Sequence, residues 1–122
     1  MAKIKTIRID DIEYVRADSV KEMAEKHDGL DYVLIRTYSA GCFTGYLKSR
    51  EGKEVTLLKA RRLWYWDGAS SLSQLAVDGV KNPSNCKFPV EVPEITLTEA
   101  TEVILVSSNA KKSIDEVKVW KQ

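Results

Sequence analysis

The sequence is poor in the residues that most catalytic and metal sites need. It has one histidine, His27, and two cysteines, Cys42 and Cys86, which stand far apart in the 122 residues. A hydrolase triad requires a base near a nucleophile, and zinc sites require closely spaced His and Cys ligands. The chain has neither pattern, nor a glycine-rich phosphate loop or dinucleotide fingerprint. We therefore expect no catalytic residue, no metal and no cofactor, and we interpret both cysteines as free thiols packed as small apolar residues.

Long apolar runs and an excess of charge of one sign are also missing. The longest apolar stretches, such as residues 103–106, are far too short to span a membrane. The N-terminus lacks the apolar core of a secretory signal, so we expect a cytoplasmic protein. Nineteen Lys and Arg face eighteen Asp and Glu, which gives a net charge of +1. Bulk charge of this size does not hold a protein on a long nucleic acid, so any polyanion site has to be local.

What is present is the composition of one globular domain over residues 1–122, with 43% hydrophobic and 30% charged residues. The patterning predicts an α+β fold, in which an antiparallel sheet of short strands is accompanied by two or three short helices. Strands are expected over 3–9, 32–38, 42–47, 54–58 and 102–106, with edge strands over 88–92 and 94–97. Helices are expected over about 19–28, over 71–79 and from Ser107 through Lys112, each introduced by a capping residue.

The most informative segment runs from Ala60 to Gly68. It contains two adjacent arginines, Arg61 and Arg62, and two of the three tryptophans, Trp64 and Trp66. Guanidinium groups bind phosphate as planar donors, and indoles stack on bases. If the strand continues through this run, Arg62, Trp64 and Trp66 share one face, which could hold a base and a phosphate. The same pattern also fits a core strand whose indoles are buried beneath Arg62.

Two other segments offer polar groups to a ligand. The predicted turn Ser39-Ala40-Gly41 follows Arg36, and turns of small residues expose backbone N–H groups that can bind anions. An ordinary hairpin, in which Gly41 supplies a positive φ, also explains this turn. The loop 81–87 contains Asn85, whose amide could read a base edge, although a solvated surface loop would have the same composition.

Four segments resemble a group of small phage and prophage proteins. They are residues 32–41 (YVLIRTYSAG), 49–55 (SREGKEV), 60–66 (ARRLWYW) and 72–80 (LSQLAVDGV), and the resemblance spans about residues 31–106. The group is similar to the first type of Thoeris anti-defence protein (anti-Thoeris). That resemblance implies an α+β subunit of a homo-oligomer, located in the cytoplasm of the infected host bacterium. It also implies sequestration of a cyclic ADP-ribose isomer, a ligand with one adenine, two riboses and a diphosphate; some members hold cyclic oligonucleotides at another site.

These observations together predict a binding protein that sequesters a small cyclic nucleotide without catalysis. Residues 1–30 would form a strand–helix extension, and residues 31–122 the ligand-binding core. The candidate ligand-binding residues are Arg36, Ser39, Ala40, Gly41, Arg61, Arg62, Trp64, Trp66 and Asn85. Because so small a subunit cannot easily enclose the ligand alone, a homo-oligomer is expected, with no membrane and no long nucleic acid as partners. The alternatives are a phage protein that inhibits a host protein by direct binding and a single-stranded nucleic-acid module.

Overall fold

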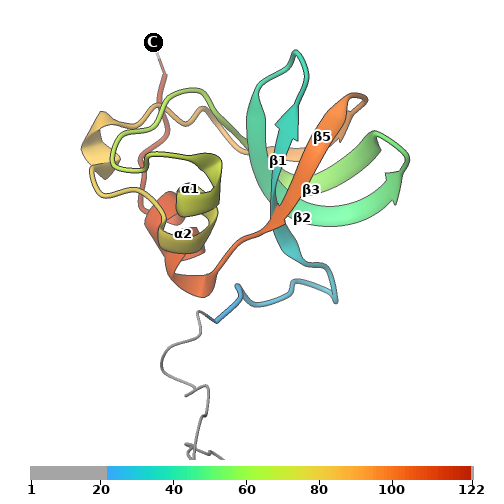
Figure 1. Cartoon of the computed structure of the whole chain (residues 1–122), viewed down its shortest axis with the longest axis horizontal. Helices are drawn as coiled ribbons and strands as arrows, with labels where there is room; N and C mark the ends of the chain where they lie inside the picture. Colours follow the sequence, from blue (N-terminus) through green and yellow to red (C-terminus); the bar gives the residue numbers. More distant parts are fainter. Residues whose placement is uncertain (1–21, 122) are drawn as a thin grey trace, which may run out of the picture.

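The computed structural model describes residues 22–121 (Figure 1). It contains strands β1 (Tyr32–Thr37), β2 (Cys42–Glu51), β3 (Glu54–Leu63), β4 (Val92–Leu97) and β5 (Ala100–Leu105). The helices are α1 (Leu72–Asp78), the short 3-10 helix η2 (Pro83–Asn85) and α2 (Ser108–Asp115). All strand pairs are antiparallel, in the order β4-β3-β2-β1-β5. The predicted α+β class is confirmed.

The sheet is strongly curled, because its two edge strands are joined to one another. Strands β4 and β5 are linked by residues 98–99 alone, yet they pair with opposite sides of the β1–β2–β3 meander. So short a link requires the two edges to approach (Figure 1). Backbone hydrogen bonds fix this closure: Tyr38 donates to the carbonyl of Glu99, and Ala100 donates to the carbonyl of Lys53.

A bulge in β3 sharpens the curl. Tyr46 pairs with Leu58 and Thr44 pairs with Arg61, so two residues of β3 stand opposite Gly45 alone. One of them, Lys59, has a φ of 52°, in the left-handed region that favours glycine. A Cβ on Gly45 would lie 3.1 Å from the carbonyl oxygen of Leu58, so only glycine allows this close crossing without a shift.

Strand β1 is buried on both faces, because the curled sheet encloses one core and packs against the helices with the other. Tyr32 and Leu34 belong to the helix-side core, whereas Val33 and Ile35 belong to the core inside the curl. The helix-side core also includes Leu63, Leu75, Ala76, Phe88, Ala110 and Ile114. The inner core also includes Phe43, Val55, Leu57, Ala60 and Leu97.

The two α-helices lie against each other beside the curled sheet (Figure 1). Ser71 caps α1 by accepting a hydrogen bond from the Gln74 backbone N–H, and Ser107 caps α2 in the same way from Ala110. Both caps and the end of α1 at Gly79 confirm the predicted helices. No helix in the described part of the chain is long and apolar enough to cross a membrane.

The predicted helix over 19–28 is wrong where it can be compared. Residues 22–28 are extended or turn: Met23 forms a bridge with Ser107, and His27 forms one with Leu30. Pairing with the start of α2 outweighs a weak helical periodicity, and Asp28, with a φ of 52°, turns the chain. Residues 19–21 and the predicted strand over 3–9 lie outside the described residues.

Candidate functional site

Two hollows adjoin α2 and share Tyr46, Lys111 and Asp115. The first, of about 470 Å³, lies between α2 and residues 22–25. The second, of about 430 Å³, lies between α2 and the curled sheet, and we call it the α2 groove. It is lined by Tyr32, Tyr46, Lys59, Arg61, Glu91, Lys111, Asp115, Val117 and Val119. Because it gathers three cations and two aromatic rings in a volume suited to a small ligand, it is the candidate site.

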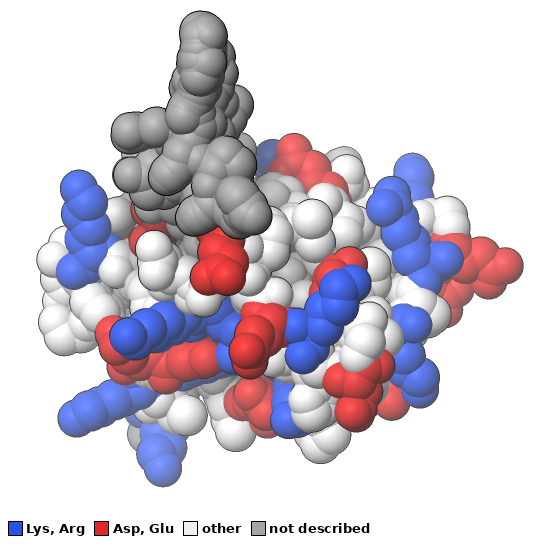
Figure 2. Space-filling model, turned by 90° about the horizontal axis from the view of Figure 1, so that it is seen from below, with Lys and Arg blue, Asp and Glu red and all other residues white. Residues whose placement is uncertain are grey.

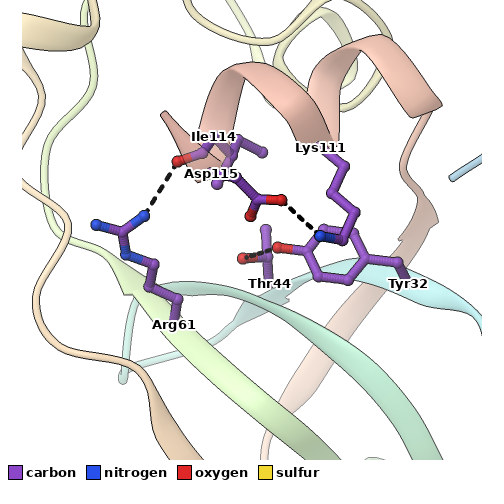
Figure 3. A network of polar contacts seen from close by, with 6 residues as sticks. All are labelled: Tyr32, Thr44, Arg61, Lys111, Ile114 and Asp115. Atoms are coloured by element: carbon purple, nitrogen blue, oxygen red, sulfur yellow. Dashed lines mark hydrogen bonds and ion pairs between the residues drawn. The ribbon is translucent and has the colours of Figure 1, made fainter. Parts of the chain in front are cut away.

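Lys111 and Asp115 project from one turn of α2 toward the sheet (Figure 3). The Lys111 Nζ donates a hydrogen bond of 2.6 Å to Asp115 Oδ2 and lies 4.9 Å from the centre of the Tyr32 ring. Burial lowers the pKa of Lys111, but the hydrogen bond and charge of Asp115 outweigh burial and raise it above its ordinary value. Lys111 therefore carries a positive charge into the groove at neutral pH.

The two tyrosines supply the aromatic wall of the groove. The Tyr32 and Tyr46 rings meet edge to face, with their centres 5.0 Å apart. The Tyr32 hydroxyl donates to Thr44 Oγ1 at 2.9 Å, and burial raises the pKa of Tyr32 to about 12 (Figure 3). Tyr32 is thus a neutral, fixed ring, and the half-buried Tyr46 is the ring more open to a ligand.

Arg61 lies at the base of the groove and is only 9% exposed. Its guanidinium donates to four backbone carbonyls, those of Phe88, Pro89, Ile114 and Val117, at 2.7–3.3 Å. Burial lowers the pKa of Arg61, although it remains a cation at neutral pH. Because four of its five N–H donors are occupied, Arg61 contributes positive charge to the groove rather than a two-pronged grip on phosphate.

The bulge in β3 places Lys59 on the lining of the α2 groove. Its left-handed conformation interrupts the alternation of the strand, and it lines the groove with Arg61, two residues later. Bulges re-aim side chains and are common beside functional sites. Lys59 is exposed, and no ion pair of its side chain is found among the residues that the structure describes. It is therefore the cation most available to a ligand.

The turn at residues 39–41, predicted as an anion site, contacts Arg62, and its polar groups form hydrogen bonds within the protein. Arg62 Nη1 donates to the carbonyl of Ala40 at 2.7 Å, and its guanidinium lies 4.5 Å from the centre of the Phe43 ring. Ser39 Oγ donates to Glu99 at 2.6 Å, and the Ala40 N–H donates to Thr37 Oγ1. These bonds leave few donors for an anion.

The rest of this hairpin fits an ordinary turn. Gly41 has a φ of 97°, with nothing within 4 Å of where a Cβ would lie. Arg36, on the preceding strand, is exposed and stands opposite Cys42 and Glu102 in the sheet. The hairpin end therefore offers one open arginine against two acidic residues, Glu99 and Glu102, whereas the three cations of the α2 groove outnumber its two carboxylates.

The shared face predicted for Arg62, Trp64 and Trp66 does not form. Strand β3 ends at Leu63, where the Trp64 backbone N–H turns to the carbonyl of Lys87. Trp64 is 64% exposed and stacks on Trp120, whereas Trp66 is half-buried against the helix-side core. Arg62 instead covers Phe43 of the inner core. The predicted alternation assumed that the strand continues to Trp66. It does not, because Tyr65 pairs with Lys87 and the strand ends at Leu63.

The last predicted site residue, Asn85, lies in η2. Its Nδ2 donates to Asp67 Oδ2 at 2.9 Å, which ties the loop to the end of the aromatic run. The nine predicted residues thus fall in five places: the α2 groove, the hairpin end, the exposed Trp64, the helix-side core at Trp66 and the η2 loop. Of these nine, only Arg61 lines the groove.

Sequence reasoning missed most of the groove residues: Tyr32, Tyr46, Lys59, Lys111 and Asp115. Two signals could have suggested them. Lys111 and Asp115 have the i, i+4 spacing of a helical ion pair, and Gly45 inside a strand indicates a bulge. Across residues 22–121, no three His, Cys, Asp or Glu side chains gather in a way that could hold a metal ion.

No curated protein and no solved structure matches the chain. One protein family does, and its match covers residues 30–114, from just before β1 almost to the end of α2. The matched region includes Tyr32, Tyr46, Lys59, Arg61 and Lys111 of the α2 groove. The chain therefore belongs to the family described as a domain of unknown function (DUF6948).

Proposed function

We propose that this protein binds a small cyclic nucleotide of the cyclic ADP-ribose type, holds it without converting it, and thereby blocks Thoeris defence. The observation that carries the proposal is the convergence of Lys59, Arg61 and Lys111 around two tyrosine rings in the α2 groove. The resemblance of residues 31–106 to anti-Thoeris proteins supplies the ligand class. Sequestration requires tight binding and slow release rather than turnover.

The groove chemistry suits a base attached to a diphosphate. In this proposal the adenine packs on Tyr46, and the diphosphate lies between Lys59 and Lys111. An ammonium has three donors, so Lys111 can keep Asp115 and bind a phosphate oxygen at the same time. Each charge-assisted bond contributes about 1.5–3 kcal/mol, and aromatic stacking contributes about 1–3 kcal/mol. Two such bonds and one stacked ring sum to about 4–9 kcal/mol, and the upper end of this range reaches the roughly 8 kcal/mol of micromolar binding before ordering costs.

This assignment moves the proposed contacts away from most of the residues predicted from sequence. Arg62 donates to the Ala40 carbonyl, and Trp66 packs against the helix-side core. The Ala40 N–H of the turn at 39–41 donates to Thr37 within the hairpin. An open groove on a subunit of this size leaves one side of the ligand in water. We therefore include in the proposal a homo-oligomer in which a second copy closes the groove, acting in the cytoplasm of the host bacterium.

Isothermal titration of the full chain with cyclic ADP-ribose isomers tests the proposal. We expect saturable heat, and Lys59→Gln and Lys111→Gln should each weaken binding about tenfold, since each removes about 1.4 kcal/mol or more of charge-assisted contact. Lys48→Gln is the matched control, because Lys48 is exposed and pairs with Glu94 outside the groove. Chromatography after incubation should recover the ligand intact. Absence of heat at micromolar protein, or conversion of the ligand, would contradict the proposal.

A further inference from the structure

A group of exposed aromatic side chains lies outside the α2 groove, where three distant segments meet. Tyr65 forms a bridge with Lys87, and Phe88 forms one with Val119. Backbone hydrogen bonds reinforce both contacts, from Trp64 to the Lys87 carbonyl and from Trp120 to the Phe88 carbonyl. We call the side chains of Trp64, Tyr65, Lys87 and Trp120 the indole platform.

The platform leaves an unusual amount of aromatic surface in water. Trp64 is 64% exposed and Tyr65 is 51% exposed. The Trp64 and Trp120 rings are within 5° of parallel, with centres 6.5 Å apart, and the Lys87 Nζ lies 5.6 Å from the centre of the Trp120 ring. Trp120 is half-buried, so it supports the exposed indole of Trp64 from a separate segment. Exposed aromatic side chains gathered in one place mark a binding surface more often than single exposed residues do.

The segments that form the platform are rich in basic residues, although the whole chain is nearly neutral. Basic and acidic side chains are interspersed on the face drawn in Figure 2, in keeping with the net charge of +1. In contrast, the segments 60–66, 86–90 and 117–121 contain five basic residues and no acidic one, although Asp67, Glu91 and Glu116 stand next to their ends. The five are Arg61, Arg62, Lys87, Lys118 and Lys121. Arg61 is buried and Arg62 donates to the Ala40 carbonyl at the hairpin end, so Lys87, Lys118 and Lys121 supply the positive charge beside the platform.

We infer that the indole platform binds single-stranded nucleic acid. A base stacks on the exposed face of Trp64, and Lys87 and Lys121 meet the flanking phosphates. Stacking on exposed aromatics beside basic side chains is the chemistry by which proteins hold single strands without reading their sequence. The charge pattern favours this occupant over an acidic protein segment, because a polyanion carrying flat rings matches both the lysines and the indoles. The sequence predicts no long nucleic-acid partner because the net charge of the whole chain is only +1. A local cluster of lysines can contact phosphates whatever that net charge is.

Fluorescence anisotropy tests this inference with labelled oligo-dT and oligo-rU of about 12 nucleotides, within the usual site size of such folds. We expect saturable binding of both probes at about 20 mM salt, with affinity falling about fivefold to tenfold at fourfold higher salt, as two phosphate contacts predict. Trp64→Ala and Lys87→Gln should each weaken binding at least about fivefold, since the first removes the stacked ring and the second removes a phosphate contact. Trp64→Phe, which keeps a ring, should recover much of the loss.

Tyr38→Ala and Lys48→Gln are matched controls, since Tyr38 is an 81% exposed aromatic residue of the β1–β2 hairpin and Lys48 is an exposed lysine paired with Glu94, and neither belongs to the platform. Both should bind the probes as the unaltered chain does. Three results would overturn the inference. The first is no saturable binding at low salt, and the second is that the Trp64→Ala and Lys87→Gln variants bind the probes as tightly as the unaltered chain does. The third is displacement of the probe by a cyclic ADP-ribose isomer that binds the groove. A fourth would assign the platform to a second copy of the chain, namely that Trp64→Ala abolishes self-association and leaves anisotropy unchanged. Because these probes do not require a groove ligand, failure here is separate from failure of the proposed function.

Discussion

Arg61 and Arg62 are neighbours in sequence, yet the two sides of β3 use them in opposite ways. Arg61 points to the helix side, where four carbonyls surround its guanidinium. Arg62 points to the hairpin end, where it donates to one carbonyl and covers one ring. The side chain is the same in both places, so the number of carbonyls within reach decides how many of its donors are occupied.

Two of the four carbonyls around Arg61, those of Pro89 and Val117, have no other donor among the described residues, whereas Phe88 also accepts from the Trp120 N–H and Ile114 from the Val117 N–H. Phe88 and Pro89 lie in an irregular segment, and Ile114 and Val117 lie at the end of α2 and just beyond it. Helix ends leave their last carbonyls without intrahelical donors, and buried carbonyls need a partner. Arg61 supplies that partner to both segments at once. It thereby fastens the C-terminal segment and residues 88–89 to β3.

The largest predicted effect follows from removing Arg61. Arg61→Met keeps much of the volume but removes four hydrogen bonds, and it leaves the carbonyls of Pro89 and Val117 without a donor among the described residues. We expect the free energy of unfolding to fall by about 3–5 kcal/mol, as when one partner of a buried charged network is removed. Urea unfolding followed by circular dichroism measures this loss.

Arg62→Met is the matched control on the other side of the strand. It removes one hydrogen bond and one ring contact at the surface, so the loss should be about 1 kcal/mol. Arg61→Lys should fall between the two, because a lysine keeps the charge with three donors instead of five. Equal losses for Arg61→Met and Arg62→Met would show that the contrast between the two sides of β3 is not energetic.

Local sequence signals predicted much of the fold, because the strands and capped helices depend on residues close together in the chain. Ser71 with Gly79 and Ser107 mark the helices that the structure contains. The site could not be predicted in the same way. Strand alternation placed Trp66 beside Arg62, but a backbone pairing with Lys87, more than twenty residues away, ends the strand first. The carbonyls that occupy Arg61 come from still more distant segments.

Alkaline pH tests a second buried polar group on the Arg61 side of the sheet. The pKa of Tyr32 rises from its ordinary value of 10.0 to about 12, chiefly because of burial. The unfolded chain therefore loses this proton first, so stability is complete below pH 10 and falls as pH rises toward 12. The expected loss is about 2–3 kcal/mol, measured as the free energy of unfolding against pH.

Tyr32→Phe sharpens this test. The variant loses the hydrogen bond to Thr44 and should be about 1 kcal/mol less stable at neutral pH, but its stability should change less between pH 10 and 12. Tyr38→Phe, at an exposed position on the hairpin, should retain the full alkaline loss. An unchanged pH dependence in the Tyr32→Phe variant would assign the loss to other groups.

The smallest predicted effect concerns Lys59, which separates stability from function within the groove. Its left-handed conformation costs a residue with a side chain about 1–2 kcal/mol, a cost that glycine avoids. Lys59→Gly should therefore raise the free energy of unfolding by about 0.5–1 kcal/mol, after allowing for the greater freedom of glycine in the unfolded chain. Lys59→Ala removes the same charge but keeps the strain, so it should leave stability nearly unchanged. If both variants weaken nucleotide binding equally while only the glycine variant is more stable, the Lys59 ammonium contributes to binding and the strain of the bulge is a separate cost in stability. If Lys59→Ala is as stable as Lys59→Gly, the bulge carries no strain, and the groove side of β3 differs from the Arg62 side only in its hydrogen bonds.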